Sequence, residues 1–208
     1  MTTNPSDSSV ASALADLDPA NLYSLIDKQN THGLNLSDPE GARSVIKPWN
    51  EREDTVKFVD SSVDDQMVIH VPFVETVRLR SIMLKVGSGE YAPGRLRVFA
   101  NHPTIVDFSD AESIRPQLDL QLLEGETKVA DYPLRVAAFA SVNSVSLHFS
   151  DAPSGEISRV YYIGFKGDPR SLGREVNSKI EVPAPNAADK PLVDKVGEKK
   201  GAPQDVAR

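Results

Sequence analysis

The sequence predicts an all-β protein built as an antiparallel jelly-roll β-sandwich, with short N-terminal helices and flexible tails. Three observations lead to this fold class. Apolar and polar residues alternate with a period of two in about eight short segments between residues 55 and 165. Gly, Pro, Asp and Ser separate these segments. The connections lack the amphipathic helices of roughly 10 to 15 residues that a parallel α/β sheet needs.

Composition sets the limits of the molecule. The chain has 208 residues, a formal net charge of −7 and no cysteine, which excludes disulfides, thiolate zinc sites and cysteine nucleophiles. We expect a flexible tail over 1–18, one sandwich domain over 19–167, and an extended or disordered tail over 168–208. No stretch approaches the roughly 18 apolar residues of a membrane span, and no targeting signal is visible. We therefore expect a soluble intracellular protein with no membrane partner.

Two Asp-Pro pairs precede the strands and predict short helices. Asp18-Pro19 places a capping residue before a proline that suits the first helical position, and apolar spacing follows as far as Ile26. Asp38-Pro39 predicts a second helix that runs to about residue 46. Lys47-Pro48 ends it, because the residue before a proline is pushed out of the helical region.

The first strands are expected at 55–58, 67–71 and 77–86. Within 77–86 the alternation changes phase, since Val77 and Leu79 are followed by Ile82, Leu84 and Val86. Such a slip predicts a β-bulge or a strand that passes from one sheet to another.

Later strands are expected at 95–100, 118–122, 134–138, 145–149 and 160–165. The last is apolar on both faces, which is typical of a central strand. A turn over 87–94 precedes this group, and 109–113 reads as a single helical turn.

Histidines are few, and their spacing matches no metal-binding motif. His32, His70, His102 and His148 are the complete set. His70 lies in an apolar strand, so we expect a hydrogen-bonded structural role. His148 falls on the polar face of its strand and is expected to be a solvated surface imidazole.

Motifs for nucleophilic catalysis and for phosphate binding are absent from the sequence. Two carboxylate clusters, Asp64-Asp65 and the stretch from Asp107 to Glu112, allow either a Ca²⁺ loop or helix capping. We favour capping by Ser109 or Asp110. We expect no catalytic residue, no cofactor and no metal site.

Basic residues suggest one surface patch. If 76–86 and 95–100 form a hairpin, Lys85 lies beside Arg95 and Arg97, and this patch either receives an acidic partner or is a solvated strand face. We expect no nucleic-acid partner, because the net charge of −7 opposes phosphate binding.

A carbohydrate-binding platform would need exposed aromatic rings. Trp49, Tyr91 and Tyr132 are the candidates outside the expected strands, and Trp49 is expected to cover the core.

Several short motifs, taken in order and spacing, resemble the PITH domain family, the proteasome-interacting thioredoxin C-terminal module. They are Gly33-Leu34-Asn35, Lys47-Pro48-Trp49, Asp65-Gln66, Val71-Pro72-Phe73, Val77-Arg78-Leu79-Arg80-Ser81, Val98-Phe99-Ala100-Asn101, Asp107-Phe108, Val142-Asn143-Ser144-Val145 and Tyr161-Tyr162-Ile163-Gly164-Phe165-Lys166-Gly167. The resemblance runs from about Leu22 to Gly167.

The resemblance implies a galactose-binding-like jelly roll without a thioredoxin domain and without redox activity. It implies a non-enzymatic protein-interaction module of the cytoplasm and nucleus that binds the regulatory particle of the 26S proteasome or an associated factor. Lys199 and Lys200, in a tail similar to that of thioredoxin-linked members, are candidate partner contacts together with Arg95 and Arg97. The alternative is a module that binds a small ligand or a carbohydrate. The oligomeric state stays open.

Overall fold

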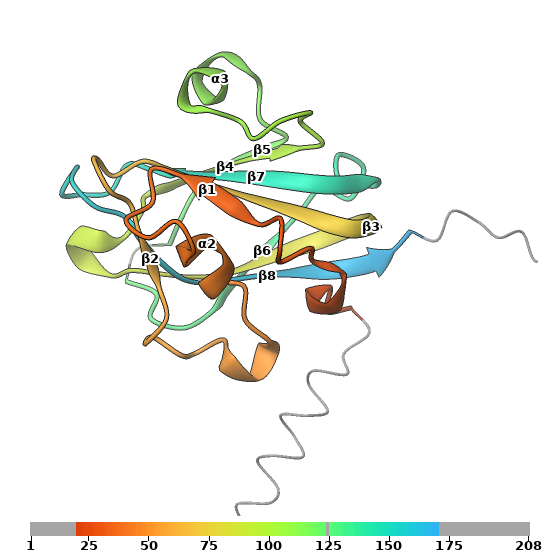
Figure 1. The fold of residues 1–208 in the computed structure, drawn as a ribbon, viewed down its shortest axis with the longest axis horizontal. Coiled ribbons are helices and arrows are strands. Elements are labelled where there is room, and N and C mark those ends of the chain that lie inside the picture. The colour runs from red at the N-terminus through yellow and green to blue at the C-terminus, as the bar shows by residue number, and fades with distance from the viewer. Residues whose placement is uncertain (1–19, 124, 171–208) are drawn as a thin grey trace, which may run out of the picture. The chain divides into compact units, whose positions relative to one another are not determined.

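The structure is a computed structural model that describes residues 20–123 and 125–170 (Figure 1). The strands are β1 His32–Leu34, β2 Val59–Asp60, β3 Met67–Val86, β4 Arg95–Ala100, β5 Leu118–Gln121, β6 Ala130–Pro133, β7 Val142–Ser150 and β8 Arg159–Pro169. The helices are α2 Gly41–Ser44 and α3 Phe108–Ser113, with 3-10 turns η1 Tyr23–Leu25, η2 Trp49–Glu51 and η3 Gly89–Tyr91. No helix in the described ranges has the length and apolar character needed to cross a membrane.

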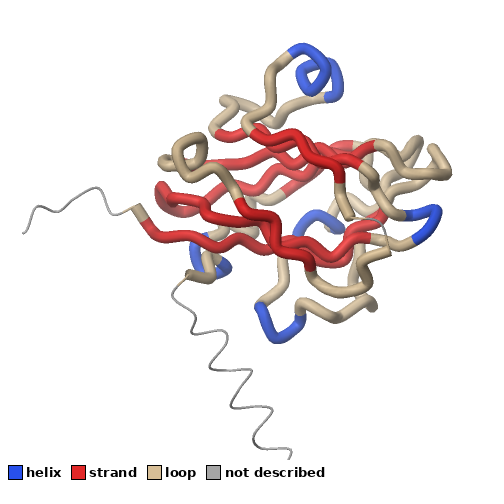
Figure 2. The backbone as a smooth tube through the Cα atoms, turned by 180° about the vertical axis from the view of Figure 1, so that it is seen from behind, coloured by secondary structure: helices blue, strands red, loops and turns tan. Residues whose placement is uncertain are grey.

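The long strand β3 belongs to both layers of the sandwich. Its first half, from Met67 to Pro72, pairs with β7 and, over 68–70, with β1. Its second half, from Val77, pairs with β8 and, over 81–84, with β6. Layer I therefore contains β1, β3, β7, β4 and β5, and layer II contains β2, β8, β3 and β6, all antiparallel. Figures 1 and 2 show the two strand layers, with the short helices lying outside them.

Irregularities in β3 explain the phase slip in its sequence. The register of β3 against β8 shifts between Leu79 and Ser81, and that against β7 shifts between Pro72 and Val77. Because Arg80 is the extra residue, Leu79 and Ile82 both face the core despite being three positions apart. Of the two predicted causes of the slip, the bulge is confirmed; the strand does pass from one layer to the other, but upstream of the slip, between Pro72 and Val77.

Apolar side chains from both layers fill the space between them. Layer I contributes Ile69, Leu147 and Phe149, and layer II contributes Leu84 and Phe165, all fully buried or nearly so. Burial of each such side chain contributes about 1.5 to 3 kcal/mol relative to exposure. This core joins the layers and fixes which strand faces point outward.

Both expected N-terminal helices are shorter in the structure. The first is only the 3-10 turn η1, and its expected capping residue Asp18 lies outside the described residues. The second is reduced to α2, and it ends before Lys47-Pro48 as expected. Asp38 accepts a hydrogen bond from the Glu40 N–H at 3.0 Å, which starts the chain into α2.

Two expected strands are wrong. Residues 55–58 form a loop, and Val56 at their centre is 83% exposed. Residues 134–138 form a turn in which only Leu134 is buried, because the Ala138 and Phe139 N–H groups bond to the carbonyls of Arg135 and Val136. The strand of this region is β6, which ends at Pro133 and contains Tyr132, a residue expected outside the strands.

The expected hairpin of 76–86 with 95–100 is also wrong. Strand β7 lies between β3 and β4, so these two strands never pair. The helical turn expected at 109–113 is α3, and its capping residue is Asp107 in place of Ser109 or Asp110. The Asp107 carboxylate accepts from the Asp110 N–H at 2.7 Å.

Truncation of Phe165 tests the core. Phe165 packs edge-on against Phe73 with ring centroids 5.4 Å apart, so Phe165→Ala should lower the free energy of unfolding by about 3 to 5 kcal/mol. Urea denaturation measures this, with the exposed Val74→Ala as the control that should change stability by less than about 0.5 kcal/mol. Equal effects of the two substitutions would show that Phe165 is not a core residue.

Candidate functional site

The basic residues expected to form one patch are separated in the structure. Lys85 lies on β3 in layer II, whereas Arg95 and Arg97 lie on β4 in layer I. Arg95 donates to both carboxylate oxygens of Asp119 at 2.8 and 2.6 Å. Arg97 donates to the Ala111 carbonyl at 2.6 Å. The hairpin patch is therefore not formed, and a partner contact by Arg95 and Arg97 stays a prediction.

The tail lysines cannot be placed. Lys199 and Lys200 lie outside the described residues, as do the whole expected tail over 1–18 and all but 168–170 of the expected tail over 168–208. Strand β8 extends to Pro169, and the Arg170 N–H bonds to the Thr76 carbonyl at 2.8 Å. A truncation that leaves the fold intact should therefore follow Arg170.

His148 is fully buried, contrary to the expected solvated imidazole. Its Nε2–H donates to the Gln66 Oε1 at 3.1 Å, and Phe108 of α3 packs edge-on with ring centroids 6.0 Å apart. Burial, together with the neighbouring Arg97 guanidinium, lowers the pKa of His148 to about 4. The polar pattern of the strand predicted an exposed His148, but α3, which follows β4 by several residues, packs onto the outer face of layer I and covers it.

His70 has the structural role expected of it. Its Nδ1 lies 2.9 Å from the Ser146 Oγ, and the His32 ring centroid is 5.2 Å away. Burial lowers the pKa of His70 to about 4, and the nearby His32 and His102 add to this. The imidazoles of His70 and His148 are therefore both neutral at physiological pH.

Carboxylates of the two acidic clusters serve as hydrogen-bond acceptors. Asp64 accepts from the Asn35 side chain at 2.7 Å, and Asp65 accepts from the Ala152 N–H at 2.7 Å. Across 20–123 and 125–170, no group of three or more His, Asp or Glu side chains is arranged to hold a metal ion.

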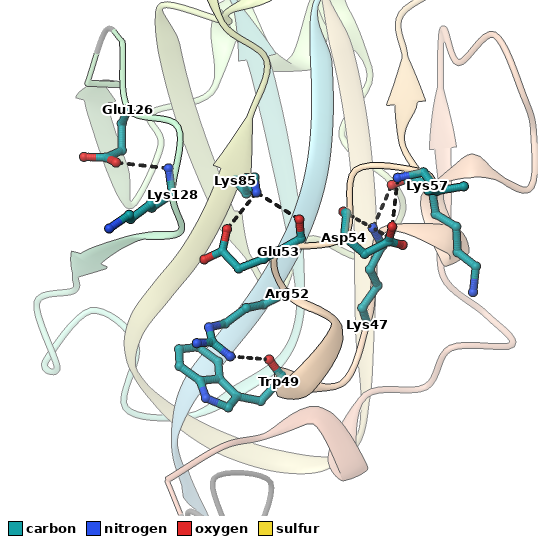
Figure 3. Close-up of polar contacts among 10 residues, drawn as sticks. Lys47, Trp49, Arg52, Glu53, Asp54, Lys57, Lys85, Glu126 and Lys128 are labelled. Carbon is teal, nitrogen blue, oxygen red and sulfur yellow. Dashed lines mark hydrogen bonds and ion pairs between the residues drawn. The ribbon is translucent and has the colours of Figure 1, made fainter. Parts of the chain in front are cut away.

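Two lysines on the outer side of layer II are buried, which the sequence did not predict, since Lys47 was expected only to end a helix and Lys85 to lie in a basic surface patch. Lys47 is 3% exposed, and its ammonium donates to the carbonyls of Asp54 and Lys57 at 2.8 and 2.7 Å (Figure 3). The Asp54 carboxylate lies 3.3 Å from the same nitrogen. Since an ammonium has three donors, all three are used, and no free amine chemistry is available there. Burial lowers the pKa of Lys47, although the Asp54 charge opposes this.

Lys85 makes the second attachment. It is 8% exposed on β3 and donates to the Glu53 carboxylate at 2.7 Å and to the Glu53 carbonyl at 3.0 Å (Figure 3). Burial raises the pKa of Glu53, but the hydrogen bond from Lys85 and its charge outweigh this, so the pKa lies below its ordinary value. The two lysines fix the segment 47–57 against layer II.

The fixed segment displays aromatic and apolar side chains. Trp49 is half-buried and does not cover the core as expected; the Arg52 guanidinium stacks on its ring 4.1 Å from the centroid. Arg52 also donates to the Trp49 carbonyl at 2.9 Å. Val56, on the same segment, and Phe58, which directly follows it, are exposed to solvent. These contacts hold a tryptophan and an arginine in one arrangement without a partner.

Arg159 of β8 links this segment to two further rings. Its guanidinium lies 4.1 Å from the Phe58 ring centroid and 5.0 Å from that of Tyr91, and Phe58 packs edge-on against Tyr161. Asp60 holds Arg159 through two hydrogen bonds of 2.6 and 2.7 Å. The hydrogen bond to Asp60 raises the pKa of Arg159. These contacts give two clusters, Trp49 with Arg52 and Arg159 with Phe58, Tyr91 and Tyr161; we call these residues, with Val56 between them in the sequence, the aromatic surface.

Comparison with known proteins gives one family model, the PITH domain, which matches residues 14–184. PITH domain-containing protein 1 of Danio rerio is 34% identical over 147 residues, which cover 71% of this chain and 69% of that protein. PITH domain-containing protein 1 of Homo sapiens is 31% identical over 153 residues, 74% of this chain and 72% of that protein.

Among solved structures, the CBM32-1 and CBM32-2 domains of ZmpB from Clostridium perfringens match with a TM-score of 0.54 at 9% identity. The match covers 76% of this chain and 39% of that chain. At this identity the likeness concerns the fold alone. The predicted class, an antiparallel galactose-binding-like β-sandwich, is confirmed.

Removal of the Lys47 ammonium tests the attachment of the segment. Lys47→Met leaves the carbonyls of Asp54 and Lys57 without their donor, so we expect a loss of about 2 to 4 kcal/mol in the free energy of unfolding. Amide exchange over 48–58 should also accelerate. The exposed Lys57→Met is the matched control and should change neither quantity. An unaltered exchange rate in Lys47→Met would contradict the role assigned to Lys47.

Stability should depend on pH through His148. The folded-state pKa is about 4, below the ordinary value of 6.5, so the unfolded chain binds a proton first as the pH falls. Stability is therefore complete above about pH 6.5 and declines towards pH 4, by at most about 1.4 kcal/mol per pH unit for this one group. Urea denaturation at several pH values measures the slope.

His148→Gln should reduce that slope, whereas His102→Gln, at a half-exposed position, should retain most of it. Identical slopes in the wild type and in His148→Gln would contradict the assignment of a neutral buried His148.

Proposed function

This chain belongs to the PITH domain family, and from that premise we propose that it is a non-enzymatic protein-interaction module that binds the 26S proteasome, through its regulatory particle, or a proteasome-associated factor. The proteasome enters the proposal through the resemblance to the family's thioredoxin-linked members. With such a partner, the protein acts in the cytoplasm and nucleus.

The aromatic surface is the observation that carries the proposal. Interfaces between proteins are enriched in Tyr, Trp, Phe and Arg, and the residues that dominate binding energy are most often Trp, Tyr and Arg. This surface combines these residue types with the exposed apolar side chains of Val56 and Phe58. Apolar side chains that serve only folding are normally buried. Exposed apolar side chains gathered in one place therefore indicate an interaction site.

Attachment by the buried lysines makes the surface suitable for binding. Binding is weakened by the entropy lost when side chains and loops become ordered, at about 0.5 to 1.5 kcal/mol per long side chain. Here the Lys47 and Lys85 hydrogen bonds already order the segment 47–57. The Arg52–Trp49 and Arg159–Phe58 contacts orient the side chains as well.

The chemistry of the described residues supports a non-enzymatic role. His70 is half-buried and His148 is buried, both in hydrogen-bonded positions, and the Lys47 amine has all its donors engaged. None of these three groups is placed to act as a nucleophile or base on a bound substrate.

The carbohydrate alternative has weaker support. A cavity of about 540 Å³ lies among the loops that carry η3, lined by Gly89, Glu90, Ala92, Pro93, Gly94, Gly125, Asp151 and Pro153. Its described lining contains no aromatic ring on which a sugar could stack, so the likeness to CBM32 domains rests on the fold alone. A higher melting temperature on addition of simple sugars would support this alternative.

Co-sedimentation with purified 26S proteasome at low micromolar concentration tests the proposal. The double variant Val56→Ser, Phe58→Ala should bind at least about tenfold more weakly, because it removes two apolar contacts of the aromatic surface. Val74→Ser removes an apolar side chain that is 63% exposed elsewhere on the molecule and should bind like the wild type. Thermal denaturation confirms that all variants are folded.

A chain that ends after Arg170, and the variant Lys199→Glu, Lys200→Glu, determine in the same assay whether the tail contributes. If these lysines make an auxiliary contact, both altered chains should bind the proteasome more weakly than the wild type, and their binding should depend less on salt. If the folded wild type fails to sediment with the proteasome, the proposed partner is wrong.

A further inference from the structure

We propose that the free edge of β5, flanked by Arg115 and Arg135, is a docking site for an extended peptide segment rich in carboxylates. The inference rests on the proposed role as a protein-interaction module and adds the chemistry of one partner segment. It concerns residues that the aromatic surface does not include.

The open side of the sandwich is formed by β5 and β6. Strand β5 pairs only with β4, and β6 pairs only with β3, so within the described ranges each is the last strand of its layer. An edge strand offers backbone N–H and C=O groups to any segment that aligns with it. Extended peptides bind such edges by adding a strand to the sheet.

A cavity lies beside this edge. It has a volume of about 330 Å³ and is lined by the segment Arg115 to Asp119, which leads into β5, and by Arg135, which follows β6. The two arginines therefore come from the two layers and flank one space. Leu118, the first residue of β5, also lines it and brings the strand edge to the cavity.

Both flanking arginines are free to bind an anion. Arg43, Arg80, Arg95 and Arg159 each form an ion pair with a carboxylate. Within residues 20–123 and 125–170, the guanidinium groups of Arg115 and Arg135 make neither an ion pair nor a hydrogen bond, and both residues are exposed. Two unpaired guanidinium groups around one cavity create a local positive potential on a chain of net charge −7.

The one carboxylate in the cavity lining does not cancel this charge. Asp119 is engaged by Arg95 through two hydrogen bonds of 2.8 and 2.6 Å. That pairing leaves Arg115 and Arg135 as the unsatisfied charges of the cavity. A guanidinium binds a carboxylate through two parallel hydrogen bonds, so each arginine can take one acidic side chain of an added strand.

The experiment uses the full chain and a short fluorescent peptide that alternates Glu and Val. Fluorescence anisotropy measures its affinity at low and high salt, and NMR follows the amide protons of Leu118–Gln121. We expect binding that weakens with salt, together with slower amide exchange along β5. A peptide with Gln in place of Glu should bind at least about tenfold more weakly, because it lacks the charges that pair with the arginines.

Arg115→Glu combined with Arg135→Glu should abolish binding of the acidic peptide. The matched control is Arg78→Glu, since Arg78 is also exposed and its side chain makes no described hydrogen bond or ion pair, but it lies on β3 away from the cavity lining. The same loss in the control, or no binding by the wild type, would overturn the proposal.

Inorganic phosphate serves as the probe for a simple anion site. If phosphate binds as tightly as the peptide and β5 amide exchange does not slow, the site takes small anions and the peptide proposal is wrong. The wild type separates the two proposals. Sedimentation with the proteasome but no peptide binding would show that the peptide proposal alone is wrong, whereas peptide binding without sedimentation would show that the proteasome proposal alone is wrong.

Discussion

Strand β3 supplies backbone hydrogen bonds to both layers of the sandwich, and its passage from one layer to the other constrains most of the remaining structure. Val77 lies opposite Val142 of β7 and Pro169 of β8, so the two layers meet at this point. The bulge at Arg80 keeps the apolar side chains of the second half directed into the core. It also directs Lys85 away from the core, onto the outer face of layer II, where a buried ammonium requires acceptors.

The segment 47–57 provides those acceptors and is thereby held against layer II. The proposed function depends on this fixed position of the segment. Burying an ammonium costs several kcal/mol unless its donors are satisfied, and replacement of such a pair by apolar residues is often neutral or stabilising. Compared with an apolar pair, the lysines and their acceptors therefore contribute geometry more than stability, because they hold one irregular segment in one position, although loss of one ammonium alone is destabilising. The consequence is a surface in which Trp49 and Phe58 are ordered before any partner arrives.

Local patterns predicted the strands that are long and buried on at least one face. The slip between Leu79 and Ile82 even predicted the bulge, because it records a local change of side-chain direction. The three-residue alternation around Val56 was too short to distinguish a strand from a loop. The candidate site was not predictable from the sequence, because the acceptors of Lys85 lie 32 residues away in sequence and no local pattern encodes that contact. The prediction of a solvated His148 was wrong for the same reason, since α3 covers this residue from a distant part of the chain.

Site-specific photo-crosslinking tests most directly whether the aromatic surface contacts the partner. A crosslinking amino acid placed at Val56 of the full chain, mixed with purified 26S proteasome, should give a discrete crosslinked subunit of the regulatory particle. The same amino acid at Val74, an exposed position on another part of the fold, should give none. Crosslinks from Val74 with none from Val56 would contradict the account and place the interface on a different face of the sandwich.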